Sequence, residues 1–267
     1  MYSAKEIFNE FYNKTSKRFG QNFLFDENIN HKIVSAAGDL SGKTVVEIGP
    51  GPGGLTVEIL KQDIKKLCII ELDRHWAEVW RNLRSHFDDK LEVIECDALK
   101  FDFKTISPNI IISNLPYNIS TQLLFKWLSE FDLYEKLILM FQKEVADRIY
   151  ARPHTKNYGK LSVLCQWKSE VSKIFDLEPG SFSPPPKVKS TVVKFTPFQK
   201  EKANNIAFKI MSDLLTDAFA NRRKTVVKSL GKYFQNPAQI LEDLGYDKNT
   251  RAEEISVDDF IKMCSQI

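Results

Sequence analysis

The sequence has few cysteines, no long apolar run and no pair of cysteines at metal-ligand spacing. Its four cysteines, at positions 68, 96, 165 and 264, lie far apart. Without a Cys-x-x-Cys pair, neither a zinc site nor a disulfide framework is expected, and buried thiols in a reducing compartment are favoured. The densest apolar stretch, Leu137–Phe141, is far shorter than the roughly 18 residues of a membrane span. The first residues mix both signs of charge without an apolar core, so we expect no signal peptide and a cytoplasmic protein.

Acidic residues are absent from four stretches, residues 11–25, 148–169, 179–200 and 218–241. These stretches hold 17 of the 38 lysines and arginines, although the net charge of the chain is only +3. Such segregation is typical of a face that binds a polyanion. Basic stretches also occur on ordinary solvated surfaces, so charge alone leaves a phosphate-bearing partner open. The four histidines show no ligand spacing, and no metal site is predicted.

The order of apolar patterns predicts an α/β fold. The chain has 267 residues, 43% of them hydrophobic and 27% charged, which suits one large or two modest globular domains. Helical periods separate short apolar runs, and this alternation indicates a Rossmann-like parallel sheet covered by helices, with ligands bound at the carboxyl ends of the strands. The expected strands are Thr44–Ile48, Leu67–Glu71, Leu91–Glu95, Asn109–Ser113, Lys136–Phe141 and Lys189–Phe195. Residues 1–200 are predicted to form the catalytic domain, and residues 201–267 a small, all-helical domain.

A glycine-rich turn follows the first predicted strand of this sheet. The segment from Gly49 to Gly54 reads GPGPGG and precedes a helical pattern. Glycines at Gly49 and Gly51 let the backbone turn sharply and approach a bound nucleotide closely. The spacing Gly49-x-Gly51-x-x-Gly54 also matches the dinucleotide fingerprint. The turn alone therefore leaves a nicotinamide dinucleotide and an adenosyl cofactor open.

Carboxylates stand at the ends of the next two predicted strands. Glu71 lies 20 residues after Gly51, where a carboxylate can accept hydrogen bonds from both ribose hydroxyls. Asp97 ends the third strand and suits an adenine amino group. Asp73 is better explained as the N-cap of the following helix.

The fourth predicted strand ends in Asn114-Leu115-Pro116-Tyr117. Proline favours an extended conformation at Leu115, so the Leu115 carbonyl and the Asn114 amide can point into one pocket. Two neighbouring acceptors suit a group with two N–H donors, such as the amino group of adenine. Tyr117 offers a flat face for an unstacked base. This tetrad predicts chemistry on an adenine amino group.

Together these motifs resemble the S-adenosylmethionine-dependent adenine-N6 methyltransferases. Two further blocks, residues 17–24 (KRFGQNFL) and 182–190 (FSPPPKVKS), resemble the ribosomal RNA adenine dimethylases. Residues 219–225 (FANRRKT) and 244–256, which open with Leu-Gly-Tyr and end in RAEEIS, resemble the branch that modifies small-subunit rRNA. The resemblance spans about residues 12–262.

This resemblance implies an enzyme that converts two adjacent adenosines, in a hairpin loop near the 3′ end of small-subunit (16S) rRNA, to N6,N6-dimethyladenosine during ribosome biogenesis. It implies S-adenosylmethionine as the methyl donor and a monomer that binds the rRNA or the small-subunit precursor, without a metal or a membrane. The residues implied to bind the cofactor are Asn22, Leu24, Gly49, Gly51, Glu71, Asp97 and Asn114. The catalytic group is Asn114, Leu115, Pro116 and Tyr117. The implied RNA contacts are Phe182 as a second aromatic wall for the base, with Lys187, Lys189, Arg222, Arg223 and Lys224 on phosphates. The helical domain of residues 201–267 is implied to recognise the rRNA.

Three alternatives compete with this interpretation. A methylase of large-subunit rRNA, of the macrolide-resistance type, shares the catalytic motifs. A non-catalytic RNA-binding or transcription-factor relative would share the fold, but both the glycine-rich turn and the Asn-Leu-Pro-Tyr tetrad are intact here. A nicotinamide-dependent dehydrogenase would share the turn and Glu71, and has no evident use for the tetrad.

Overall fold

The computed structural model describes residues 3–12, 22–87, 90–198, 206–221 and 223–267. The chain divides into two compact units. The first comprises residues 1–143 and 172–196, and the second comprises residues 144–171 and 197–267. The predicted assignment of catalysis to residues 1–200 and of rRNA recognition to residues 201–267 stays a prediction.

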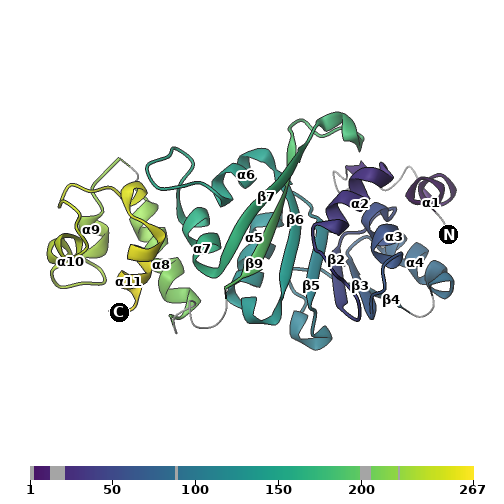
Figure 1. The fold of residues 1–267 in the computed structure, drawn as a ribbon, viewed down its shortest axis with the longest axis horizontal. Helices are drawn as coiled ribbons and strands as arrows, with labels where there is room; N and C mark the ends of the chain where they lie inside the picture. Colours follow the sequence, from purple (N-terminus) through teal and green to yellow (C-terminus); the bar gives the residue numbers. More distant parts are fainter. Residues whose placement is uncertain (1–2, 13–21, 88–89, 199–205, 222) are drawn as a thin grey trace. The chain divides into compact units, whose positions relative to one another are not determined.

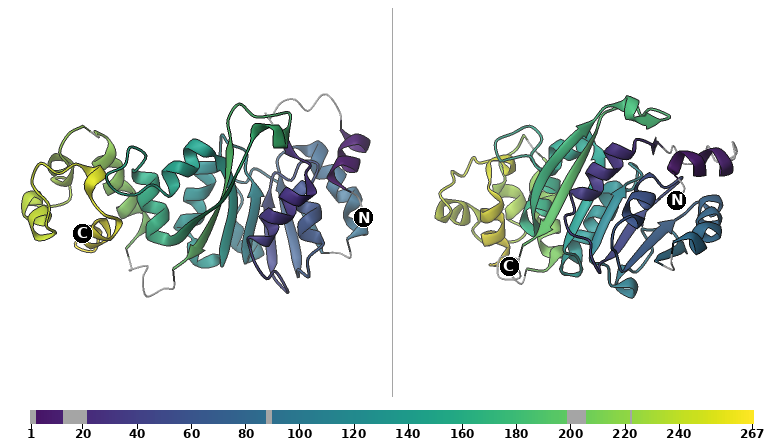
Figure 2. Two further views of the ribbon diagram at one scale, coloured as in Figure 1. Left: turned by 45° about the horizontal axis from the view of Figure 1, so that its top comes forward. Right: turned by 45° about the vertical axis from the view of Figure 1, so that its right-hand side comes forward.

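The first unit is built on a seven-stranded sheet whose strands lie in the order β4-β3-β2-β5-β6-β9-β7. Its strands are β2 (Thr44–Ile48), β3 (Lys66–Glu71), β4 (Leu91–Glu95), β5 (Ile110–Asn114), β6 (Lys136–Gln142), β7 (Ser169–Leu177) and β9 (Ser190–Pro197). Strands β2 to β6 pair in parallel, whereas β9 pairs with β6 in antiparallel fashion. The six strands expected from apolar runs are therefore confirmed, and β7, which is mostly half-exposed, was not predicted. Figures 1 and 2 show these strands side by side.

Helices α3 and α4 pack on strands of this sheet, and α1 and α2 pack on α3. In α4 the side chains of Trp76, Val79, Trp80 and Leu83 are buried, as their helical spacing predicts. The helices of the first unit are α1 (Ala4–Phe11), α2 (Glu27–Ser35), α3 (Gly54–Leu60), α4 (Arg74–Leu83) and α5 (Ser120–Ser129), with short 3-10 turns at Arg84–His86, Phe103–Ile106, Phe131–Leu133 and Pro179–Ser181. Helix α3 contacts β3 and β5, and α2 packs against α3 (Figure 1).

A small antiparallel ribbon holds the segment before α2 against the proline-rich segment. Strand β1 (Phe23–Leu24) pairs with β8 (Phe182–Ser183), and Leu24 lies opposite Phe182. Both of these side chains belong to the main hydrophobic core. The ribbon therefore brings two motifs that are far apart in sequence to one place.

The second unit is helical where the structure describes it. It contains α6 (Lys143–Ile149, from its second residue), α7 (Lys160–Lys168), α8 (Phe208–Phe219), α9 (Val227–Leu230), α10 (Pro237–Asp243) and α11 (Val257–Cys264), with a 3-10 turn at Ala252–Glu254. Helices α7, α8 and α11 pack on one another. The spacing of Met211, Leu214, Leu215, Ala218 and Phe219 predicts one apolar face of a helix, and in α8 the first four of them are buried and Phe219 is half-buried. None of the described helices is long and apolar enough to cross a membrane.

Candidate active site

One cavity of about 530 Å³ opens at the carboxyl ends of β2, β3, β4 and β5. This is the edge at which parallel α/β sheets bind their ligands. The segment around β1 contributes to the same wall. Of the residues predicted to bind a cofactor, those that line the cavity are Asn22, Leu24, Gly49, Glu71, Asp97 and Asn114.

Glycines shape the turn between β2 and α3 because other atoms occupy the space of a side chain. Gly53 has φ +88°, and an ideal Cβ there would lie 2.0 Å from Cζ2 of Trp80. The Trp80 indole N–H donates to the Gly51 carbonyl over 2.8 Å, which holds the turn from α4. A Cβ on Gly54 would lie 2.2 Å from the Leu24 carbonyl oxygen. The turn and β1 therefore approach each other at backbone distance.

Gly51 is not among the residues that line the cavity, and its contacts in the described structure are with the residues that shape the turn. It has φ +52°, and a Cβ there would lie 2.9 Å from the Phe23 ring. Its N–H donates to Glu71 Oε2 over 3.4 Å. Its predicted direct contact with a cofactor stays a prediction.

Glu47 is a buried carboxyl at the end of β2, only 3% exposed. The Thr56 hydroxyl donates to its Oε2 over 2.6 Å. Burial raises its pKa from 4.5 to about 8, against the opposing effect of the Thr56 hydrogen bond, and the nearby Glu71 carboxyl raises it further. Glu47 therefore holds a proton at neutral pH, and a cation bound in the cavity favours its ionised form.

We expect Glu47→Gln to stabilise the protein more at alkaline than at acidic pH. A glutamate with its pKa raised from 4.5 to about 8 contributes stability that is fully present below pH 4.5 and is lost as the pH rises through 8. Thermal unfolding at pH 5 and pH 9 measures this. The variant should match the parent at pH 5 and exceed its Tm by several degrees at pH 9, since about 1 kcal/mol corresponds to roughly 2–4 °C at this size. An equal Tm difference at both pH values would contradict it.

Glu71 is held by backbone N–H groups at the end of β3. Its Oε1 accepts from the Asp73 N–H over 2.8 Å. Burial raises its pKa to about 7, against the lowering effect of the bonds from Asp73 and Gly51. The carboxylate of Asp73 is the N-cap of α4 and accepts from the His75 N–H, as the sequence predicts.

Asp97 stands at the end of β4, half-buried, and its Oδ1 accepts from the Leu99 N–H over 3.0 Å. Cys96 lines the cavity beside it. The Asp97 carboxylate is thus fixed at the adjoining strand end, where the sequence predicts a contact with adenine.

The tetrad Asn114 to Tyr117 lines the cavity at the end of β5. The Asn114 Nδ2 donates to the Asn22 carbonyl over 3.3 Å, which orients the amide from the opposite wall. The hydroxyl of Tyr117 shares a 2.6 Å hydrogen bond with the Ser190 hydroxyl. Burial raises the pKa of Tyr117, so the phenol stays neutral at physiological pH. Ser113 donates to the Ile48 carbonyl over 2.8 Å and ties β5 to the glycine-rich turn.

The residues predicted to contact RNA differ in their exposure and in their contacts. Phe182 is 5% exposed, packs in the main core and does not line the cavity, so its role as a wall for the base stays a prediction. Lys187 is exposed, and Lys189 forms an ion pair with Glu178 at 2.6 Å. Arg223 and Lys224 are exposed in the second unit. Arg222 lies outside the described residues.

Several residues of the site were not predicted from the sequence. They are Asn30 and Glu47 on the wall, together with Thr56, Trp80 and Ser190 behind it. The predicted stripe of α4 contains Trp80, but an amphipathic pattern identifies a buried face and not the hydrogen bond of one indole. Asn30 is a polar residue on the buried face of α2, and that mismatch was the one available signal.

The charge of the cavity selects a class of ligand. Four carboxyl groups line it, those of Glu47, Glu71, Asp73 and Asp97, and of these the buried Glu47 is protonated at neutral pH until a cation binds. None of the described lining residues is lysine, arginine or histidine. This wall fits a cationic adenosyl cofactor and disfavours the pyrophosphate of a dinucleotide, which argues against a dehydrogenase although the turn and Glu71 are present. The described residues also contain no cluster that could hold a metal ion.

Comparison with known proteins agrees with this geometry. The family model of ribosomal RNA adenine dimethylases matches residues 12–267. Proteins named ribosomal RNA small subunit methyltransferase A match at 43% identity in Allorhizobium ampelinum, covering 93% of this chain and 91% of the relative, and at 41% in Rhodospirillum rubrum, covering 94% and 87%.

Solved structures give the same result. A dimethyladenosine transferase from Plasmodium falciparum matches with TM-score 0.79 and 32% identity, covering 90% of this chain and 95% of that one. The 23S rRNA methyltransferase ErmE matches with TM-score 0.71 and 20% identity over 92% and 99%, which shows a shared fold alone. The chain therefore belongs to the ribosomal RNA adenine dimethylase family.

Proposed function

We propose that this protein dimethylates N6 of two adjacent adenosines in the hairpin loop near the 3′ end of small-subunit rRNA, during ribosome biogenesis. The observation that carries this proposal is the cavity in which the Asn-Leu-Pro-Tyr tetrad faces an acidic wall without a basic side chain. The names of the relatives support the small subunit as the target. We further propose that the protein acts as a monomer in the cytoplasm.

We propose that the residues at each strand end hold a different part of the cofactor. S-adenosylmethionine, when bound, supplies a methyl group on a positively charged sulfur. Glu71 would hold the ribose and Asp97 the adenine amine, with Gly49 beneath the methionine moiety. Asn22 and Leu24 would contact the cofactor from the opposite wall.

Asn114 and the Leu115 carbonyl orient the target amino group. Because Asn114 donates its Nδ2 to the Asn22 carbonyl, its Oδ1 is the atom that can accept an N6 hydrogen. Two acceptors on N6 turn its lone pair away from the adenine ring and raise its electron density. This arrangement needs no general base, since the proton can leave after transfer. Positioning of this kind can contribute about 7–11 kcal/mol.

Tyr117 would stack on the target base after it rotates out of the loop. Its hydroxyl is held by Ser190, so the ring is oriented before the RNA arrives. A hairpin loop favours this step, because unstacking a loop base costs less than opening a duplex.

Lys187 is the predicted phosphate contact nearest in sequence to the ribbon, exposed and without an ion pair in the described structure. For rRNA binding, log K falls as log salt concentration rises. We expect Lys187→Gln to make this negative slope smaller in magnitude by about 0.7. Filter binding between 50 and 300 mM salt measures this slope. Lys104→Gln is the matched control, because Lys104 is exposed, pairs with Glu130 and lies outside the basic stretches. Equal slopes for Lys187→Gln and the parent would remove Lys187 from the RNA interface.

The proposed function is tested with labelled S-adenosylmethionine and ribosomal subunits from a strain that lacks both methylations. The RNA is digested and its nucleosides are identified. We expect N6,N6-dimethyladenosine from the small subunit alone. Label in the large subunit would assign the enzyme to the resistance type instead, and no label despite cofactor binding would overturn the proposed substrate.

A further inference from the structure

An unpartnered acceptor on the cavity wall belongs to none of the predicted site residues. Asn30 of α2 is 2% exposed and lines the cavity. Its Nδ2 donates to the Leu24 carbonyl over 3.2 Å, whereas its Oδ1 has no hydrogen-bond partner in the described part of the chain. Leaving a buried acceptor unpaired costs free energy, so such an atom in a ligand cavity indicates a contact that the ligand completes.

The direction of this amide is determined by its neighbours. The Leu24 carbonyl can only accept, so the side chain must turn Nδ2 toward it, and this leaves Oδ1 as the amide atom without a partner. A Cβ on Gly54 would lie 2.8 Å from Nδ2 and 3.3 Å from Oδ1 of Asn30. The amide therefore sits in contact with the first residue of α3, next to the glycine-rich turn.

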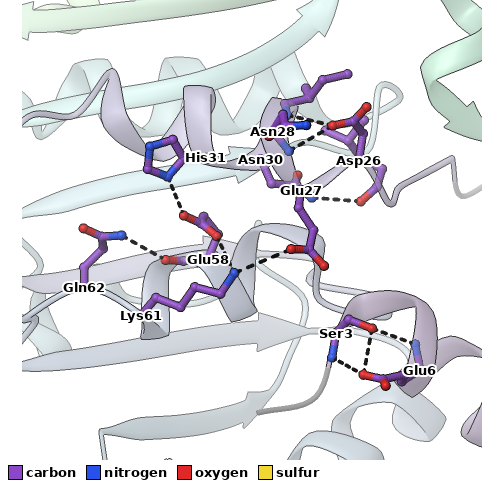
Figure 3. A network of polar contacts seen from close by, with 12 residues as sticks. Ser3, Glu6, Asp26, Glu27, Asn28, Asn30, His31, Glu58, Lys61 and Gln62 are labelled. Atoms are coloured by element: carbon purple, nitrogen blue, oxygen red, sulfur yellow. Dashed lines mark hydrogen bonds and ion pairs between the residues drawn. The ribbon is translucent and has the colours of Figure 1, made fainter.

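Helix α2 is held so that Asn30 keeps this position. Asp26 caps the helix by accepting from the N–H groups of Asn28 and Ile29. One turn later, His31 Nδ1 lies 2.7 Å from Oε1 of the buried Glu58 on α3, which also binds Lys61 (Figure 3). The Asn30 acceptor is thus in place before a ligand binds.

Few buried side-chain atoms in the described structure both lack a hydrogen-bond partner and belong to a residue that lines the cavity. Most buried side-chain atoms without a partner are indole N–H or phenol groups away from the cavity. Asp73 Oδ2 is the other one on a lining residue, and it stands at the β3 end, where the ribose is expected. Asn30 instead contacts the start of α3 and the Leu24 carbonyl, two residues after Asn22, whose carbonyl binds Asn114 at the β5 end, where the methyl transfer is expected.

We propose that Asn30 Oδ1 accepts a hydrogen bond from the α-ammonium group of the bound cofactor and so selects for its amino-acid portion. This inference rests on the proposed function. With the ribose at Glu71 and the adenine amine at Asp97, the α-ammonium is the N–H donor of the cofactor that has no assigned side-chain acceptor. The acidic wall, without a described basic side chain, favours the positive group at this position.

The test compares two probes by isothermal titration calorimetry. S-adenosylhomocysteine carries the α-ammonium, and 5′-methylthioadenosine has the adenosine and thioether without the amino-acid portion. In Asn30→Ala we expect the Kd of S-adenosylhomocysteine to rise by about tenfold to a hundredfold. The Kd of 5′-methylthioadenosine should stay within about twofold. The matched control is Asn28→Ala, an exposed asparagine on the same helix, which should change neither value.

The outcomes separate this inference from the proposed function. If Asn30→Ala weakens both probes equally, or neither, Asn30 does not read the ammonium, and binding of S-adenosylhomocysteine by the parent still supports the proposed function. If the parent binds neither probe, the proposed cofactor site itself fails. If Asn30→Ala does not fold, Asn30→Thr is used instead. The threonine hydroxyl is too short to reach both the Leu24 carbonyl and the α-ammonium group, so the same ratio of the two Kd values decides.

Discussion

Asn114→Ala is expected to lower kcat by about a hundredfold to a thousandfold, while the Kd for S-adenosylhomocysteine changes by less than about fivefold. The reason is that Asn114 reaches the cavity at the end of β5 and is oriented by the Asn22 carbonyl. Its Oδ1 would act on the target amino group, and the strand-end carboxylates that we propose to hold the cofactor are left unchanged. Single-turnover methylation of rRNA and calorimetry measure the two quantities.

Asn114→Asp provides the control for this prediction. It keeps an acceptor oxygen at the same distance along the side chain, replaces the donor to the Asn22 carbonyl by a second acceptor and adds a negative charge. We expect it to recover part of the lost turnover. If Asn114→Ala instead abolishes cofactor binding and leaves turnover at saturating cofactor intact, Asn114 is a cofactor contact and has no role in orienting N6.

Gly54→Ala is expected to weaken cofactor binding by at least about a hundredfold and to lower the Tm by several degrees. Its Cβ would lie 2.2 Å from the Leu24 carbonyl oxygen and 2.8 Å from Nδ2 of Asn30. The first of these is a backbone atom, so relief requires β1 to move away from the turn. This displacement would open the wall that carries Asn22 and Leu24.

Gly180→Ala makes the same chemical change where there is room for it. A Cβ at Gly180 meets nothing within 4 Å. This variant should bind S-adenosylhomocysteine as the parent does, with an unchanged Tm. Parent-like binding by Gly54→Ala in calorimetry would show that β1 is not a rigid wall of the cofactor site.

The sequence by itself determined six of the seven strands of the sheet and the order of its strand-end motifs. Runs such as Leu137–Phe141 are apolar throughout and lie buried in β6, so their pattern needed no knowledge of distant residues. The Asn-Leu-Pro-Tyr tetrad and the glycine-rich turn are equally local, because proline and glycine restrict or free the backbone within a few residues. Parallel pairing then brings the strand ends to one edge of the sheet, and several predicted site residues meet there.

Only the tertiary structure decided which side chains are available to a ligand. Phe182 and Tyr117 are both aromatic residues in family motifs, yet Phe182 is buried in the core while Tyr117 lines the cavity. Asn30 became a candidate because its Nδ2 binds the Leu24 carbonyl while its Oδ1 is left without a partner in the described structure. Partners of this kind depend on burial and on hydrogen bonds between chain segments far apart in sequence, and a local pattern of residue types carries no information about either.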